Sequence, residues 1–233
     1  MTADTGFEGR NSGSLIHPDT AQLALKRVAV AALLAIALGF VMQALILGAK
    51  LATGASLPGV TLFVDVAQGV TWSFLVCAGV SVATVVTQGR VVLASLIAAV
   101  FAPIALALAK SAQKVMAHLI GAASEPGVLS LTTVGIFRAV EYGVLGWVLA
   151  VLVQRQEARA WPYLGIGAAV GLLVGGSFVG LSLNAAASTG AEPETAQVAA
   201  MVVNEVFFPI GCALVIFASQ WVGRSLKVVL QNR

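Results

Sequence analysis

The chain has 233 residues, of which 59% are hydrophobic and 10% are charged, and its formal net charge is +3. Soluble globular domains are about 45–50% apolar and about 25% charged. This composition therefore excludes a soluble enzyme, a disordered protein and a nucleic-acid-binding protein. It indicates a protein whose solvent is the lipid bilayer.

Six apolar runs are long enough to cross a membrane, since a transmembrane helix needs about 20 such residues. The predicted spans are 28–49, 60–87, 91–109, 128–153, 162–183 and 196–222. None shows the ten-residue alternating pattern of a transmembrane barrel. We therefore predict an all-α integral membrane protein, with one six-helix domain over 21–233. The stretch 109–122 either extends the third span or lies in the interface.

Residues 1–20 are polar and are predicted to be a disordered cytoplasmic tail, with a helix start near Pro18 and Asp19. The following apolar run, 28–49, is longer than the 7–15 residues of a signal-peptide core. We therefore expect it to be a retained first span.

The positive charges predict the orientation of the spans. On one side of the predicted bundle, nine basic residues lie in the N-terminal tail or at the ends of the even-numbered spans: Arg10, Lys26, Arg27, Arg90, Arg155, Arg159, Arg224, Lys227 and Arg233. On the opposite side lie three lysines, Lys50, Lys110 and Lys114. Cytoplasmic segments carry the excess of Lys and Arg. Both termini are thus predicted to be cytoplasmic, in a plasma or inner membrane, which agrees with an even number of spans.

The even-numbered spans end alike. Gln88, Gln154 and Gln220 are 66 residues apart in both steps, and each is followed closely by an arginine. This spacing suggests three repeated helical hairpins in a pseudo-threefold arrangement. The alternative is that three hairpins of ordinary length share the spacing by coincidence.

Polar residues inside the spans are the candidates for a functional site. Arg138 and Glu141 share one helix face because they are three residues apart. At 1.5 Å per residue, they and Glu205 lie about 20–24 Å from the cytoplasmic glutamines, in the outer half of the bilayer. We predict that Arg138, Glu141 and Glu205 form a cluster that joins the fourth and sixth spans. Asn204 adjoins Glu205, and Asp65 with Gln68 would cap the cluster on its outer side.

A charge within the bilayer is costly and needs a partner or a water-filled cavity. One interpretation of the cluster is an outward-facing polar cavity that binds an ion, a proton or a small polar solute. The other is a buried ion pair that sets the register of the helices. The sequence leaves both open.

Proline and glycine modify three of the spans. Pro103 and Pro209 each remove a helical hydrogen bond and are expected to kink their helices. The fifth span carries a helix-packing face of glycines four residues apart. Its members are Gly167, Gly171, Gly175, Gly176 and Gly180.

No catalytic, metal or cofactor motif occurs. Cys77 and Cys212 belong to no CxxC pair, and His118 stands alone beside an outer segment. We therefore expect no metal, no cofactor and no enzymatic activity. A membrane enzyme acting on lipid is the least favoured reading.

The function that the sequence favours is a small transporter or channel for an ion or a small polar solute. The alternative is a non-catalytic membrane subunit or assembly factor of a larger complex, which would require a membrane-protein partner or a second copy of the chain. A hydrated cleft that reaches Glu205 would favour transport. A closed bundle with the glycine face of the fifth span exposed to lipid would favour the subunit.

Overall fold

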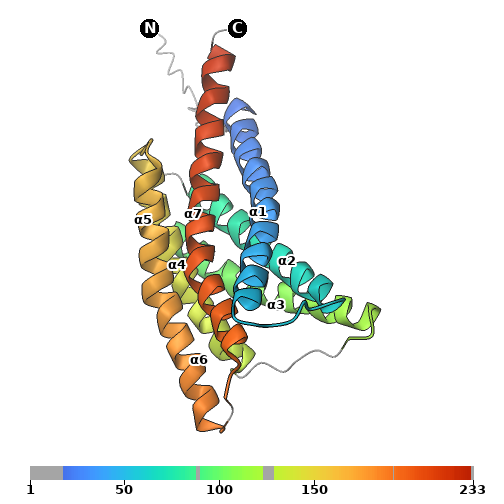
Figure 1. The fold of residues 1–233 in the computed structure, drawn as a ribbon. Coiled ribbons are helices and arrows are strands. Elements are labelled where there is room, and N and C mark those ends of the chain that lie inside the picture. The colour runs from blue at the N-terminus through green and yellow to red at the C-terminus, as the bar shows by residue number, and fades with distance from the viewer. Residues whose placement is uncertain (1–17, 88–89, 123–128, 191, 232–233) are drawn as a thin grey trace, which may run out of the picture.

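The computed structural model describes residues 18–87, 90–122, 129–190 and 192–231, and the regular structure in these ranges is helical (Figure 1). The elements are α1 (Pro18–Ala52), α2 (Thr61–Val86), α3 (Val91–Leu119), α4 (Leu131–Gln154), α5 (Ala160–Val170), the π-helical turn η1 (Gly171–Gly175), α6 (Gly176–Ser188) and α7 (Thr195–Gln231).

Six helical segments are long and apolar enough to span a membrane, as predicted, so the chain is a multi-pass membrane protein that associates with the lipid bilayer. They run over Ala24–Ala52, Thr61–Val86, Val91–Leu119, Leu131–Gln154, Ala160–Ser188 and Thr195–Ser225. Their lengths of 24 to 31 residues exceed the roughly 20 that a bilayer core requires. Tilting of the helices accommodates the additional residues, or these residues extend into the headgroup layers.

Two helix boundaries settle points from the sequence. The helix α3 reaches Leu119, ten residues past the apolar run that ends at 109, so the stretch 109–122 extends the third span over most of its length and Lys110 and Lys114 are part of the helix. The helix α1 begins at Pro18, as its start signal predicts, and so overlaps the end of the tail predicted for 1–20. The rest of that tail, 1–17, lies outside the described residues.

The helices pack as an inner and an outer set. Each outer helix contacts two inner ones: α1 contacts α2 and α7, α3 contacts α2 and α4, and α5 contacts α4 and α7. The inner helices α2, α4 and α7 also contact one another. Buried residues make up 56%, 44% and 44% of the apolar windows of α2, α4 and α7, against 22%, 28% and 33% for the three outer segments.

Small side chains let the outer helices approach the inner ones. The face that α3 buries is made of alanines: Ala94, Ala98, Ala102, Ala105 and Ala109. Opposite them lies Gly146 of α4, where an added Cβ would come within 2.6 Å of the Ala98 Cβ. Helices in lipid are held by such close packing, because there is no hydrophobic drive between them.

The bundle has two distinct ends. The start of α1 and the end of α7 lie at one of them, the terminal end, and the ends of α1, α3 and α6 lie with the starts of α2, α4 and α7 at the opposite one, the hairpin end (Figure 1). At the terminal end, Arg224 Nη2 donates a 2.9 Å hydrogen bond to the Glu157 carbonyl. This bond ties α7 to the α4–α5 connection.

Candidate functional site

Arg138, Glu141 and Glu205 form one buried ion cluster inside the bundle. Arg138 of α4 donates from Nη1 to Glu205 Oε2 at 2.7 Å and from Nη2 to Glu205 Oε1 at 2.5 Å. The same Nη1 donates to Glu141 Oε2 at 2.6 Å. The paired, planar geometry is the one in which arginine binds a carboxylate most specifically. The predicted joining of the fourth and sixth spans by this cluster is confirmed.

The cluster is almost fully withdrawn from the surface. Arg138 is 8% exposed, Glu141 is 2% exposed and Glu205 is 3% exposed. Aromatic rings flank the guanidinium: its central carbon lies 5.3 Å from the ring centroids of both Trp72 and Phe178. Such rings attract a cation through their π faces, most strongly where water is excluded.

The cluster has one cation for two carboxylates. Glu205 uses both oxygens on Arg138, and Asn204 Nδ2 also donates to Glu205 Oε1 at 3.2 Å. Glu141 Oε1 and Arg138 Nε are buried without a hydrogen-bond partner among the described residues. If both carboxylates are ionised, the cluster carries a formal charge of −1. An uncompensated charge inside the bilayer is expensive.

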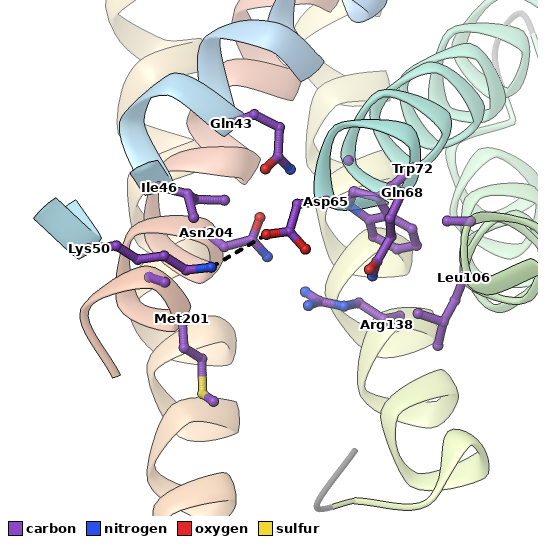
Figure 2. Close-up of a pocket in the computed structure, with 13 residues that line it drawn as sticks. Gln43, Ile46, Lys50, Asp65, Gln68, Trp72, Leu106, Arg138, Met201 and Asn204 are labelled. Atoms are coloured by element: carbon purple, nitrogen blue, oxygen red, sulfur yellow. Dashed lines mark hydrogen bonds and ion pairs between the residues drawn. The ribbon is translucent and has the colours of Figure 1, made fainter. Parts of the chain in front are cut away.

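A cavity of about 250 Å³ lies against the cluster on its hairpin side (Figure 2). Figure 2 shows the guanidinium of Arg138 pointing from α4 into the cavity, with Gln68 and Trp72 of α2 on one side and Asn204 of α7 on the other. Gln43 and Lys50 of α1 also belong to its polar lining. Side chains from four spans thus line this cavity.

The two residues expected to cap the cluster, Asp65 and Gln68, differ in their contacts. Gln68 lines the cavity together with Arg138. Asp65 lines it too, but its carboxylate pairs with Lys50 Nζ at 3.4 Å, and no bond joins it to Arg138. The lysine at the end of the first span is the partner that the sequence analysis did not assign.

A larger cavity, of about 740 Å³, reaches the cluster between α3, α4, α6 and α7. It shares Gln68, Arg138 and Asn204 with the first cavity and also touches Glu205. Lys110 and Lys114 of α3 line it as well, because α3 extends past its predicted end. The cluster therefore lies where two polar cavities meet.

The glycine face divides into two groups. A Cβ on Gly167, Gly171 or Gly175 would come within about 2.5–2.6 Å of α7 backbone atoms, so these three glycines pack against that helix. Gly176 and Gly180 have nothing within 4 Å of an added Cβ and are exposed. The π turn η1 contains Gly171 and Gly175 of the first group and ends directly before Gly176.

Pro209 lies inside α7, four residues after Glu205, and is fully buried. Proline has no N–H, so the Glu205 carbonyl loses its normal helical donor. Gly175 lies against this carbonyl, since an added Cβ would be 2.5 Å from its oxygen. The π turn therefore packs directly on the backbone of a cluster residue, and π turns are frequent at functional sites.

The remaining singled-out residues lie apart from the cluster or beside it in the core. Pro103 is inside α3, and an added Cβ on Gly135 of α4 would lie 3.6 Å from its Cβ. Cys77 and Cys212 are free, buried thiols. Within the described ranges, no three or more His, Cys, Asp or Glu side chains are grouped to hold a metal ion.

Comparison of the chain with protein-family models, with curated proteins and with solved structures found no match.

Proposed function

We propose that the protein is a transporter or channel that admits an ion or a small polar solute from the hairpin end of the bundle to the Arg138–Glu141–Glu205 cluster. The observation that supports this most is the meeting of the 250 Å³ and 740 Å³ cavities at Arg138. Ionisable groups in spans that face a cavity commonly mark a solute or ion path. The proposal assigns no chemical reaction and no cofactor to the chain.

We place the hairpin end outside a plasma or inner membrane and both termini in the cytoplasm. The support is the excess of nine basic residues over three between the two sides. In this orientation the cavities open outward. The imbalance of one cation and two carboxylates in the cluster suits a site that takes up a proton during the transport cycle.

We also propose that the bundle is built from three related hairpins around a pseudo-threefold axis. The packing of α1, α3 and α5 around α2, α4 and α7 supports this. So does the spacing of three residues that meet at the cluster: Trp72 and Arg138 are 66 residues apart, and Arg138 and Glu205 are 67 apart. One position of each inner helix would then contribute to the site.

The experiment compares wild-type protein with Glu205→Gln in proteoliposomes. Influx is followed by light scattering in isosmotic sodium chloride, potassium chloride and sodium acetate, and by an internal pH dye. We expect wild-type liposomes to take up at least one of these ions faster than protein-free liposomes. Glu205→Gln should abolish that excess while eluting and melting as a folded protein. Glu157→Gln, at the terminal end, is the matched control and should transport normally.

Two results would overturn the proposal. One is wild-type uptake no faster than in protein-free liposomes under all of these gradients. The other is a folded Glu205→Gln variant with wild-type uptake, which would leave the cluster a purely structural ion pair.

One observation favours the second candidate, a non-catalytic subunit or assembly factor. Gly176 and Gly180 are exposed, four residues apart on α6, and unoccupied by any other part of the described chain. Such a face allows another transmembrane helix to approach closely. Gly176→Leu with Gly180→Leu would then release a co-purifying membrane protein, or a second copy, without lowering the melting temperature.

A further inference from the structure

The 740 Å³ cavity has walls of opposite character. One wall comes from α3 and carries Lys110, Gln113 and Lys114 within about one helical turn. The side chains that α4 and α6 contribute are largely apolar, apart from Arg138 and Ser182. These apolar side chains, which form the apolar wall, are Leu131, Val134, Phe178, Leu183 and Ala186.

The charges that line this cavity do not cancel. Among the described residues its cationic side chains are Lys110, Lys114 and Arg138, and the one carboxylate is Glu205. Glu205 is already held by both nitrogens of Arg138. Two lysines remain, and neither has an ion-pair partner among the described residues.

The lysine wall has only neutral hydrogen-bond partners. Lys110 Nζ donates to Gln113 Oε1 at 2.9 Å, and no carboxylate of the described residues lies within ion-pair distance of it, since the nearby Asp65 pairs with Lys50. Lys110 is half-buried on a membrane-spanning helix, where a cation interacts with an anion more strongly than in water. By contrast, Lys50 in the 250 Å³ cavity is paired with Asp65. The surplus of positive charge therefore faces the larger cavity.

We propose that this cavity binds an organic anion with an apolar chain, such as a carboxylate or a phosphate monoester or diester. The anionic group lies between Lys110 and Lys114, and the chain lies along Leu131, Val134 and Phe178. The volume is within the roughly 300–1,000 Å³ of ordinary small-molecule sites. An inorganic cation or a sugar would leave both the lysine pair and the apolar wall unmatched.

This inference rests on the proposed transport function in one respect, because it names the class of solute that the site admits. As a binding site it can be tested separately. The same chemistry has two sources, a free amphiphilic anion and the headgroup of an anionic phospholipid. Both place an acidic group beside the lysines and a chain beside the apolar wall.

The test is calorimetric titration of purified full-length protein in a neutral maltoside detergent, with matched detergent blanks. The probes are octanoate, octyl phosphate, octyltrimethylammonium and acetate. We expect both octyl anions to bind, and octyltrimethylammonium and acetate to bind at least ten-fold more weakly. Lys110→Gln with Lys114→Gln should weaken octanoate binding at least ten-fold.

Two variants separate charge from general damage. Lys110→Arg with Lys114→Arg keeps both charges and should retain octanoate binding. Lys26→Gln removes a lysine near the terminal end and should bind octanoate as wild type does. Equal binding of octanoate and octyltrimethylammonium would overturn the proposal, and so would wild-type octanoate affinity in the folded double glutamine variant.

Competition identifies the source of the ligand. Displacement of octanoate by added phosphatidylglycerol, but not by phosphatidylcholine, supports the site with a lipid headgroup as occupant. Octanoate binding that neither lipid displaces supports it with a free anion. Lysine-dependent binding without any uptake in proteoliposomes would uphold the site and reject the transport function. Uptake in proteoliposomes with no octanoate binding would uphold the transport function and reject the anion site.

Discussion

Arg138 is the residue on which the buried cluster depends. It is the only cation that bonds to Glu141 and Glu205 among the described residues. A buried ion pair often contributes little net stability, but removal of one partner leaves an uncompensated charge. The consequences of substitution therefore depend on how many charges are removed together.

We expect Arg138→Met to lower the free energy of unfolding by about 3–5 kcal/mol, because two buried carboxylates lose their cation. Arg138→Met combined with Glu141→Gln and Glu205→Gln removes every charge and should be more stable than Arg138→Met alone. Denaturant unfolding in detergent measures both. A triple variant less stable than the single variant would contradict this view of the cluster.

Arg138→Lys is expected not to restore the wild-type unfolding midpoint. Lysine keeps the charge, but its ammonium group cannot reproduce the two-pronged contact with Glu205 or the stacking between Trp72 and Phe178. The measurement is the same unfolding curve, with Lys26→Arg as the exposed control. A midpoint equal to that of the wild type would show that charge alone suffices.

At the scale of the element, α5, η1 and α6 form one span with two kinds of glycine. Gly175 lies against the Glu205 carbonyl, whereas the next residue, Gly176, is exposed. Both have ordinary right-handed helical backbone angles. The pair therefore separates the effect of close packing from that of helix propensity.

We expect Gly175→Ala to destabilise the protein by about 1–3 kcal/mol, because the added methyl group overpacks the interface with α7. Gly176→Ala meets no neighbour and should be neutral or stabilising by up to about 1 kcal/mol, since alanine favours helix. Thermal unfolding in detergent compares them. Equal effects of the two substitutions would contradict the packing of η1 on α7.

At the scale of the molecule, the six-helix membrane architecture follows from composition and run length, because a span needs apolar residues wherever it meets lipid. The cluster followed from three charged residues in otherwise apolar spans. The end of α3 was left open, since Lys110, Gln113 and Lys114 interrupt the apolar run, and apolarity alone does not show that the helix continues past them. The flanking rings were also missed, because Trp72 and Phe178 look like ordinary lipid-facing or core residues until the helices are placed together.

The proposed orientation gives a labelling prediction. In a Cys77→Ala, Cys212→Ala background, single cysteines at Ala55 and Thr189 should react with a membrane-impermeant maleimide added outside intact cells. A cysteine at Gln156 should react only after permeabilisation. The opposite pattern would invert the bundle and place both cavities toward the cytoplasm. Labelling of detergent-solubilised protein controls for accessibility at each position.

The order of synthesis gives the two carboxylates different histories. Arg138 leaves the ribosome 67 residues before Glu205, whereas Glu141 follows it by three residues on the same helix. The fourth span therefore carries a counter-ion for Arg138 within its own sequence, before Glu205 has been synthesised. The helix α7 is synthesised after the other described helices. Its Glu205 accepts two hydrogen bonds from Arg138, and the helix packs against α1. Glu141 is thus the first counter-ion that Arg138 acquires. In the finished protein it keeps one bond to Arg138 and one carboxylate oxygen without a partner among the described residues.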